Sequence, residues 1–334
     1  MAPLIYRAFE ELLANPRVLT IGNFDGVHRG HQHLLGWVHQ RSTKHGARSL
    51  VVTFDPLPAE VLRPGSAPLR LCTIDQRIAL IGACQIDDVL VLRFDDQLAN
   101  QTPESFLERL RACAAPVEIV VGHDFRFGRE RSGSVEMLRH WCQLLGFGLT
   151  VVPRLDLPSG AVSSTRIRAL LADGAVEAAA ELLGRPYVLV GDVVAGQQRG
   201  QLLGYPTANL RLIDRLALPA DGIYAVLVSV DGSLHLQPGM LYIGTRPVFG
   251  QEARAIEVHL LDVRQDLYDR RLTVLLVRRL RDDRWFPSID ALIEQMQADE
   301  RSTRDVLAHL PGDWPPPLAR VMLSAVEGAV STDG

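Results

Sequence analysis

Val18-Leu-Thr-Ile-Gly-Asn-Phe-Asp-Gly-Val-His-Arg-Gly-His31 is the stretch that decides the fold of the first half of the chain. Its first four residues are β-prone and run into Gly22, and a helical spacing of apolar residues begins only after His31. The stretch therefore predicts a buried strand, a tight loop and the start of a helix. Because a helix N-terminus presents unpaired N–H groups and glycine lets the backbone approach a ligand closely, this junction predicts a phosphate-binding site.

Two histidines, His28 and His31, stand at the mouth of the expected helix, three residues apart. This spacing lets both imidazoles lie on one side of the helix. Two imidazole donors at that point would stabilise the charge that develops on a phosphate during group transfer, without a covalent intermediate. The alternative is a plain turn that carries two solvated histidines, and the three glycines of the loop count against it.

Length and composition fit two domains with separate cores, because the chain has 334 residues, of which 47% are apolar and 22% charged. The net charge of −4 gives no overall reason to expect nucleic-acid or membrane binding. No apolar run approaches the ~20 residues of a membrane helix, and residues 1–13 lack the pattern of a signal peptide. The cysteines are far apart in the sequence and are expected to be reduced thiols of a cytoplasmic enzyme: Cys72, Cys84, Cys113 and Cys142.

Strand and helix patterns alternate through the rest of the first half. Apolar strands are expected at residues 49–54, 89–92, 118–122 and 149–152, and helices at residues 31–46, 74–83, 103–112 and 135–145. This alternation predicts an α/β fold with a doubly wound parallel sheet. Ligands of such sheets bind beyond the carboxyl ends of the strands, where the loops after Ile21, Phe54 and Val121 should lie.

The loop after Val121 mixes aromatic, basic and small residues in Gly122-His-Asp-Phe-Arg-Phe-Gly128. Phe125 and Phe127 could stack on a flat ring, and arginines of this loop could bind phosphate. The alternative is a solvated basic loop whose two aromatic side chains pack into the core.

A second anion signal is Ser163-Ser-Thr-Arg-Ile-Arg168, which is expected to open a helix running to about residue 183. Arg166 and Arg168 in the first turn oppose the helix dipole, at a cost of roughly 0.3 to 1 kcal/mol each without an anion. A bound polyphosphate would reverse that sign. The alternative is a capped surface helix whose arginines extend into solvent.

From residue 187 the pattern changes to strands with short turns, at residues 187–194, 222–230, 240–244, 255–261 and 271–280. This pattern predicts a small antiparallel β-barrel, followed by helices at residues 288–299 and onward to about residue 310. The expected domains are therefore residues 1–185 and 186–311, with a tail of unknown role at residues 312–334.

The barrel is expected to carry a second phosphate site in Gly196-Gln-Gln-Arg-Gly-Gln-Leu-Leu-Gly-Tyr-Pro-Thr-Ala-Asn209. If Thr207 and Asn209 are extended they share one face, where their oxygens suit Mg²⁺, while the glycines and Arg199 surround nucleotide phosphates. The run lacks the Gly-Lys-Ser/Thr of a Walker motif, and the alternative is a glycine-rich barrel loop.

The strand Ala255-Ile-Glu-Val-His-Leu-Leu261 alternates, which places Glu257 and His259 on the face opposite its apolar residues. A carboxylate there is either a solvated outer position or a base aimed into a cleft. For His259 we expect a solvated place on the outer face.

These motifs resemble one family over about residues 15–310. The first stretch contains the His-x-Gly-His signature of the nucleotidyltransferase superfamily, and as a whole it is similar to the bacterial bifunctional riboflavin kinase/FMN adenylyltransferases, or FAD synthetases. Ser-Ser-Thr-x-x-Arg, beginning at Ser163, resembles the second signature of that superfamily. Pro206-Thr-Ala-Asn209 resembles the signature of riboflavin kinases.

The resemblance implies that the barrel phosphorylates riboflavin with ATP and Mg²⁺ to give FMN, and that the first domain adenylylates FMN to FAD with release of pyrophosphate. It implies catalytic roles for His28, His31 and Arg168 in adenylyl transfer, and for Glu257 as the base that deprotonates the ribityl 5′-hydroxyl. The implied ATP contacts are Gly22, Asn23, Phe24, Asp25, Gly30, Ser164, Thr165, Arg168, Gly196, Arg199, Gly200, Gly204 and Pro206. The implied flavin contacts are Asp124, Phe125, Arg126 and Phe127, and the implied Mg²⁺ ligands are Thr207 and Asn209.

The chain departs from the family pattern at four positions. Leu57 replaces a usual histidine, Arg246 an asparagine, Val248 a threonine and Asp269 a glycine. Arg246 and Val248 leave open an FMN adenylyltransferase whose barrel binds flavin without turnover. A second alternative, from another class, is a flavin-binding regulator without either activity. The expected partners are small-molecule substrates, with no nucleic acid and no membrane, and a homo-oligomer stays open.

Overall fold

The computed structural model describes residues 2–195, 204–248, 251–263 and 266–324, and of residues 246–248 and 251–253 only the backbone. The chain divides into two compact units, one of Met1–Leu69 with Ile74–Ser163 and the other of Arg70–Thr73 with Ser164–Gly334. The boundary between the units therefore falls before residue 164. The domain boundary expected near residue 185, where the helical pattern gives way to strands, stays a prediction.

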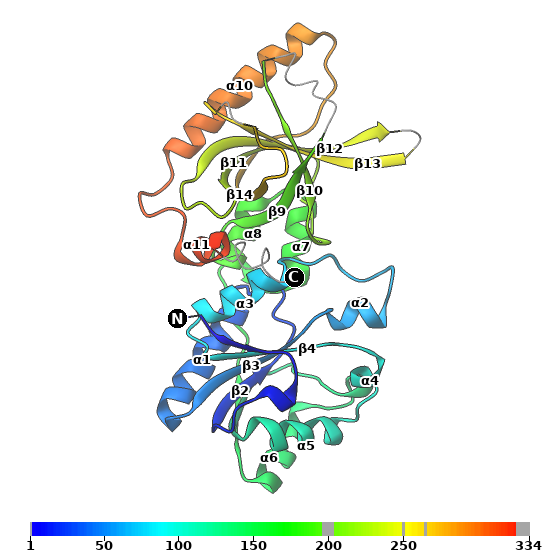
Figure 1. Ribbon diagram of the computed structural model, residues 1–334, viewed down its shortest axis with the longest axis vertical. Coiled ribbons are helices and arrows are strands. Elements are labelled where there is room, and N and C mark those ends of the chain that lie inside the picture. The colour runs from blue at the N-terminus through cyan, green and yellow to red at the C-terminus, as the bar shows by residue number, and fades with distance from the viewer. Residues whose placement is uncertain (1, 196–203, 249–250, 264–265, 325–334) are drawn as a thin grey trace. The chain divides into compact units, whose positions relative to one another are not determined.

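The first unit is built on a parallel sheet (Figure 1). Within the described residues it has six strands, in the order β1-β4-β3-β2-β5-β6. Their bounds are β1 Leu4–Tyr6, β2 Arg17–Ile21, β3 Arg48–Phe54, β4 Asp88–Leu92, β5 Pro116–Gly122 and β6 Gly148–Val152. The predicted doubly wound sheet is confirmed, and only the edge strand β1 was not expected.

The order of the strands reverses at β2, which pairs with β3 on one side and with β5 on the other. After β2 the chain adds β3 and β4 outward, and then returns past β2 to form β5 and β6. Such a reversal leaves a crevice outside the carboxyl ends of the two central strands, which is where ligands of these sheets bind. The loops after β2 and β5 are therefore the ones that the topology brings to a binding site.

Helices cover both faces of this sheet. Leu19 and Ile21 of β2 belong to a core cluster with Phe106 of α5 and Leu138 of α6, whereas α1 packs on β2, β3 and β5 without joining that cluster. The helices of the first unit are α1 Arg29–His45, α2 Pro58–Leu62, α3 Ile74–Ala83, α4 Asp96–Ala99, α5 Pro103–Ala114 and α6 Val135–Leu145. Short segments complete it: the 3₁₀ turns η1 Phe9–Glu11 and η2 Arg129–Arg131, and the strands β7 Asp156–Leu157 and β8 Gly160–Ala161.

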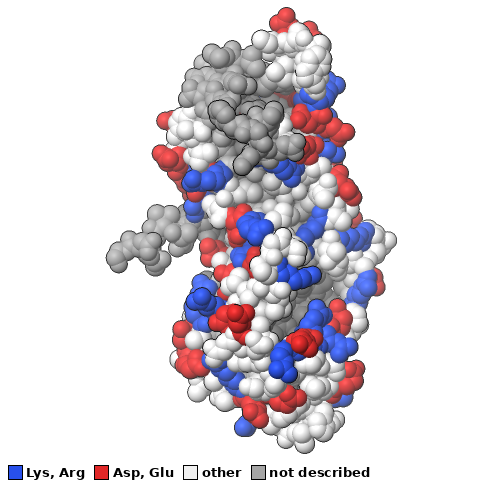
Figure 2. All heavy atoms as spheres, turned by 90° about the vertical axis from the view of Figure 1, so that its right-hand side faces the viewer, with Lys and Arg blue, Asp and Glu red and all other residues white. Residues whose placement is uncertain are grey.

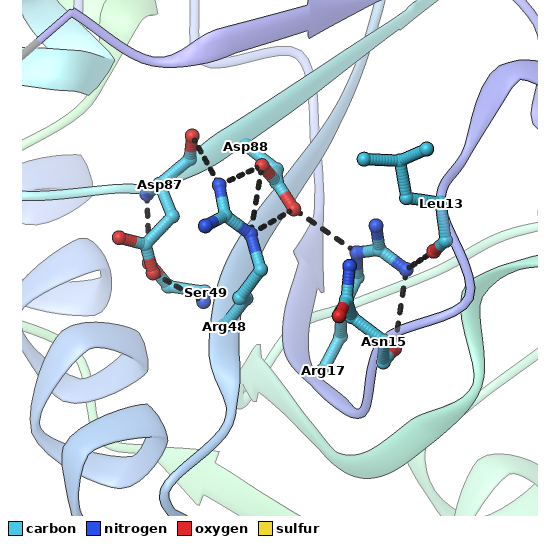
Figure 3. A network of polar contacts seen from close by, with 7 residues as sticks. All are labelled: Leu13, Asn15, Arg17, Arg48, Ser49, Asp87 and Asp88. Atoms are coloured by element: carbon cyan, nitrogen blue, oxygen red, sulfur yellow. Dashed lines mark hydrogen bonds and ion pairs between the residues drawn. The ribbon is translucent and has the colours of Figure 1, made fainter.

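A buried ionic network joins the amino ends of three of these strands (Figure 3). Arg17 and Asp88 are fully buried, and Nε of Arg17 lies 3.1 Å from Oδ2 of Asp88. Arg48 makes a second ion pair to the same carboxylate. Asp87 in turn accepts hydrogen bonds from the backbone N–H and the hydroxyl of Ser49. Because its ion pairs and hydrogen bonds tie β2, β3 and β4 to one another, the network is structural, and the opposite edge is left for ligands.

The second unit is a closed antiparallel barrel, as predicted. Its described strands follow the order β10-β13-β12-β11-β14-β9, and β14 pairs with β9. Their bounds are β9 Tyr187–Val194, β10 Ala208–Leu212, β11 Gly222–Val230, β12 Gln237–Val248, β13 Gln251–Leu260 and β14 Arg271–Arg281. The helices are α7 Ser164–Ala172, α8 Val176–Leu183, α10 Ile289–Ala308 and α11 Pro317–Ser324.

Three details of the second unit correct the sequence predictions. The single helix expected at residues 163–183 is two helices, because the chain turns at Gly174 with a φ of +74°. Conversely, the two helices expected after residue 288 are the single helix α10, whose first turn is capped by Ser288. The strand β10 was missed, because its five residues follow directly on the glycine-rich loop.

Acidic and basic side chains are interspersed on the face shown in Figure 2. Among the described residues of that face, neither sign gathers into one continuous field. This distribution agrees with the small net charge of −4.

Candidate active sites

The loop after β2 is tight and unusual in its backbone. The N–H of Gly22 donates to the carbonyl of Val52 at 3.0 Å, which continues the sheet by one residue. Phe24 and Val27, which flank Asp25 and Gly26, then have φ angles of +49° and +38°. Residues other than glycine rarely adopt this region of φ. Backbone held in this way concentrates at functional sites, so the conformation marks this loop as a candidate site.

His28 and His31 lie against each other at the start of α1. The Nδ1 atom of His28 accepts a hydrogen bond of 3.3 Å from the N–H of His31, so His28 is the N-cap of the helix. The two rings stack with centroids 3.6 Å apart and an angle of 14° between their planes. The ring of His31 also meets that of Phe24 at an angle of 62°, with centroids 5.2 Å apart. The structure therefore brings the two predicted catalytic histidines together.

Gly30 makes room for this arrangement. A Cβ at Gly30 would lie 3.2 Å from Cε1 and 3.3 Å from Nδ1 of His28, closer than most real Cβ contacts. His28 itself is only 6% exposed, so its ring has little freedom to move aside. Glycine at this position thus sets the place of the imidazole, besides letting the backbone approach a ligand.

His31 is held in its neutral form. Burial is the main reason that its pKa lies well below the ordinary value of 6.5, and the charges of His28 and Arg77 act in the same direction. A neutral imidazole still offers one N–H as a hydrogen-bond donor at neutral pH. The N–H of His31 can therefore donate a hydrogen bond to a phosphate oxygen while the ring carries no charge.

The remaining predicted residues of this loop differ in exposure. Asn23 is exposed and its carbonyl accepts a 3.2 Å hydrogen bond from the hydroxyl of Thr53, whereas Asp25 is 4% exposed. Leu57, where the family has a histidine, is a buried side chain at the start of α2. Its backbone N–H donates to Glu60, so this position serves the fold.

The loop after β5 separates the four predicted flavin contacts. Asp124 and Arg126 are exposed and Phe125 is half-buried, whereas Phe127 is 7% exposed and belongs to the hydrophobic core. The rings of Phe125 and Phe127 stack with centroids 5.4 Å apart. Phe127 thus packs into the core, which was the alternative to stacking on a ligand. The flavin contacts of this loop stay predictions.

Ser164, Thr165 and Arg168 lie on α7, which begins at Ser164 and belongs to the second compact unit. Thr165 is exposed, and Ser164 and Arg168 are half-buried. Their roles toward ATP stay predictions.

A second candidate site is formed by Thr207, Asn209 and Glu257 on the barrel. The hydroxyl of Thr207 donates a hydrogen bond of 3.1 Å to Glu257, and Asn209 lies directly opposite Glu257 on the adjacent strand. Glu257 is 8% exposed, which contradicts the solvated alternative for this carboxylate. The structure therefore gathers the predicted base and both predicted metal ligands at one place.

His259 is less solvated than expected. This side chain is half-buried, and its Nδ1 lies 2.8 Å from the carbonyl oxygen of Pro206, to which it donates. Its ring also meets that of Tyr205 edge-on, with centroids 5.1 Å apart. His259 thus fixes the backbone just before Thr207, a contact that the alternation of a single strand could not reveal.

Tyr242 connects the carboxylate to a cavity that sequence reasoning missed. It lies opposite Glu257 in the pairing of β12 with β13, and its hydroxyl donates to Asp283 at 3.0 Å. Directly after Asp283, the loop that follows β14 lines a cavity of about 660 Å³ together with α10. Trp285, which is 83% exposed, and Phe286 contribute aromatic surface to it.

The other predicted or unusual positions of the barrel lie in its loops or outside the described residues. Gly196, Arg199 and Gly200 lie outside the described residues, as do the side chains of Arg246 and Val248. Gly204 and Pro206 are described and exposed, and Gly204 has a φ of +83°. Asp269, where the family has glycine, has a φ of +59°, which explains why glycine suits the position and why aspartate is tolerated there.

The donor set of this site suits magnesium. Within the described residues no group of three histidine, cysteine or carboxylate side chains could hold a metal ion. A hydroxyl and an amide oxygen beside a carboxylate are instead hard ligands, of the kind that Mg²⁺ uses together with substrate phosphates and water. Thr207 and Asn209, next to Glu257, fit that description.

Comparisons with known proteins agree with this division into two sites. Residues 11–166 match the family model described as FAD synthetase, and residues 183–307 match the one described as riboflavin kinase. A bifunctional riboflavin kinase/FMN adenylyltransferase of Pseudomonas fluorescens is 40% identical over 87% of this chain and 93% of its own length. Its namesake from Escherichia coli (strain K12) is 39% identical over 86% of this chain and 92% of its own length.

A solved structure is also similar to the chain over most of its length. It is that of a macrolide-efflux protein from Streptococcus pneumoniae, with a TM-score of 0.83, 31% identity, and coverage of 91% of this chain and 99% of that one. The name of that protein states another activity than the family models do. In the described part of this chain, no helix is both long and apolar enough to span a membrane.

Proposed function

The chain belongs to the family of bifunctional riboflavin kinase/FMN adenylyltransferases, and on that premise we propose how its residues divide the two reactions. The enzyme phosphorylates riboflavin with ATP to give FMN, and adenylylates FMN with ATP to give FAD and pyrophosphate. Residues 1–185 carry the adenylyl transfer and residues 186–311 the kinase reaction. The observation that supports this division best is the presence of two separate clusters, His28 with His31 and Thr207 with Glu257.

In adenylyl transfer, a phosphate oxygen of FMN attacks the α-phosphorus of ATP in line, and pyrophosphate leaves. His28 and His31 donate hydrogen bonds to the oxygens that gain charge in the transition state, and the N-terminus of α1 adds its dipole. Arg168 binds the departing pyrophosphate. Asn23 and Asp25 hold the nucleotide, and Asp124, Phe125 and Arg126 contact the flavin.

In the kinase reaction, Glu257 accepts the proton of the ribityl 5′-hydroxyl as that oxygen attacks the γ-phosphorus of ATP. Thr207 and Asn209 would hold Mg²⁺, which neutralises charge on the phosphates when it is bound. His259 keeps the backbone at Pro206 in place, so that the hydroxyl of Thr207 stays beside Glu257.

The flavin ring of riboflavin binds in the cavity beside Trp285 and Phe286. Two aromatic side chains suit a flat ring, and the bond from Tyr242 to Asp283 ties this loop to the strand that faces Glu257. Because both reactions consume ATP, the proposed compartment is the cytoplasm, and the proposed partners are small molecules alone.

A second candidate function is FMN adenylyltransferase activity alone, which the departures Arg246 and Val248 favour. Incubation of the full chain with riboflavin, ATP and Mg²⁺, followed by chromatographic separation of the flavins, distinguishes the cases. The bifunctional enzyme makes FMN and FAD from riboflavin. A chain that converts supplied FMN but not riboflavin has an inactive kinase, and one that converts neither is a binding protein.

A further inference from the structure

Arg77 is a buried cation beside the adenylyl-transfer site. It lies on α3 with 0% of its surface exposed, and its Nη1 donates a hydrogen bond of 2.8 Å to the carbonyl of Phe54. Within the described residues, its Nε and Nη2 atoms are buried and have no hydrogen-bond partner. A guanidinium removed from water in this way is costly to the fold, so its retention calls for a role other than stability.

Two features at the carboxyl edge of the sheet lie close to this charge. Phe54 is the last residue of β3, whose carboxyl end adjoins that of β2, so the hydrogen bond holds the strand next to the loop that carries His28. The charge of Arg77 also acts on His31, whose Nδ1 is buried without a partner among the described residues. By contrast, Arg17 of β2, which is also fully buried, is paired with Asp88 at the amino edge of the sheet.

We propose that Arg77 is a positioning residue for adenylyl transfer, anchored to the Phe54 carbonyl, whose buried positive charge favours the negatively charged transition state beside His28 and His31. This inference rests on the adenylyl-transfer function proposed above. Arg77 does not touch the substrate, because it is fully covered. It acts across a medium of low polarity, where a fixed charge is screened far less than in water.

The positive charge of Arg77 also favours the neutral form of His31. The charged or titratable groups that act on this imidazole are His28, which stacks on it, and Arg77, while the ring of Phe24 lies beside it at an angle. Burial and both neighbouring charges lower the pKa of His31, so removal of one of those charges should raise it. This effect gives the proposal a readout that a purely structural role would not move.

The test compares Arg77→Met and Arg77→Lys with Arg17→Met in the full chain, measuring FAD formation from FMN and ATP. For Arg77→Met we expect kcat to fall by at least about tenfold, with KM for both substrates within about twofold, because charge stabilisation of this kind acts on the transition state. Arg77→Lys, which keeps the charge, should recover most of kcat. Arg17→Met should lower thermal stability and leave the kcat of the folded fraction unchanged.

Control measurements show whether Arg77→Met is folded, and a titration tests the effect of its charge on His31. Riboflavin phosphorylation and the circular-dichroism spectrum of Arg77→Met should match the wild type, and NMR titration should place the pKa of its His31 nearer to the ordinary 6.5. A kcat equal to wild type, or an unchanged His31 titration, would overturn the role of Arg77 while leaving the proposed function intact. A wild-type chain that makes no FAD from FMN would overturn both.

Discussion

The hydroxyl of Thr207 donates a hydrogen bond of 3.1 Å to the carboxylate of Glu257. Because its proton is committed to that carboxylate, the oxygen of Thr207 keeps its lone pairs for another partner. The same contact places an acceptor for the substrate proton next to a ligand for the metal. One hydrogen bond thus links the two tasks of the proposed kinase site.

Thr207→Val should therefore abolish most kinase activity while preserving the shape of the side chain. We expect at least a tenfold loss of kcat for FMN formation, about the effect of removing one group from a catalytic constellation. FAD formation from supplied FMN should be unchanged. Thr207→Ser, which keeps the hydroxyl, is the matched control, and equal losses in the two variants would argue against a role for the oxygen.

Gly30→Ala should impair adenylyl transfer by displacing the ring of His28. The added Cβ would lie 3.2 Å from that imidazole, which is 6% exposed and cannot simply turn away. The rate of FAD formation should fall, whereas riboflavin phosphorylation should not. Gly36→Ala in the same helix is the control, because nothing lies within 4 Å of its Cβ and alanine there should stabilise α1 by about 0.5–1 kcal/mol. Similar FAD rates in both variants would contradict the packing argument.

Gly244→Ala should weaken riboflavin binding. An added Cβ would collide with the hydroxyl of Tyr242, so the tyrosine would have to leave Asp283 and the loop beside Trp285. We expect a raised KM for riboflavin, measured by FMN formation at varied substrate concentration. Tyr242→Phe removes only the hydrogen bond to Asp283 and should give a smaller rise in KM. If neither variant changes KM, the cavity is not the flavin site.

Stability should depend on pH through Glu118. Burial alone would raise its pKa, but hydrogen bonds from Arg41, Thr150 and His45 outweigh burial and lower the pKa below 4.5. A carboxyl whose pKa is lower in the folded state stabilises the fold above its unfolded pKa, and this contribution is lost as the pH falls through the folded value. The melting temperatures of the wild type and Glu118→Gln should therefore differ most near neutral pH and converge in acid. A difference in melting temperature that does not depend on pH would contradict this role of Glu118.

Much of the fold followed from the sequence, because its signals are local. The strand expected at residues 18–21 and the helices α3 and α6 are marked by the spacing of their apolar residues, and α6 also by its caps Ser134 and Gly146. The histidine pair was likewise predictable, since the spacing of His28 and His31 on a helix fixes their common side.

The remainder depends on contacts between distant segments. The alternating strand β13 gives Glu257 and His259 the same pattern, and only Thr207 and Pro206, in the loop before β10, decide what each side chain binds. Arg77 occurs in an amphipathic helix like any exposed arginine, and its burial depends on the end of β3. Asp269 was noticed as a departure from the family, but its reason, a φ of +59°, is a property of the folded turn.

The central claim is that this chain holds two active sites that work independently on the same flavin. The most direct test incubates His28→Ala and Glu257→Gln with riboflavin, ATP and Mg²⁺, and separates the flavins by chromatography. His28→Ala should accumulate FMN without FAD, whereas Glu257→Gln should leave riboflavin unchanged but convert supplied FMN to FAD at the wild-type rate. FAD formation at full rate by His28→Ala, or loss of both reactions in either folded variant, would contradict the account.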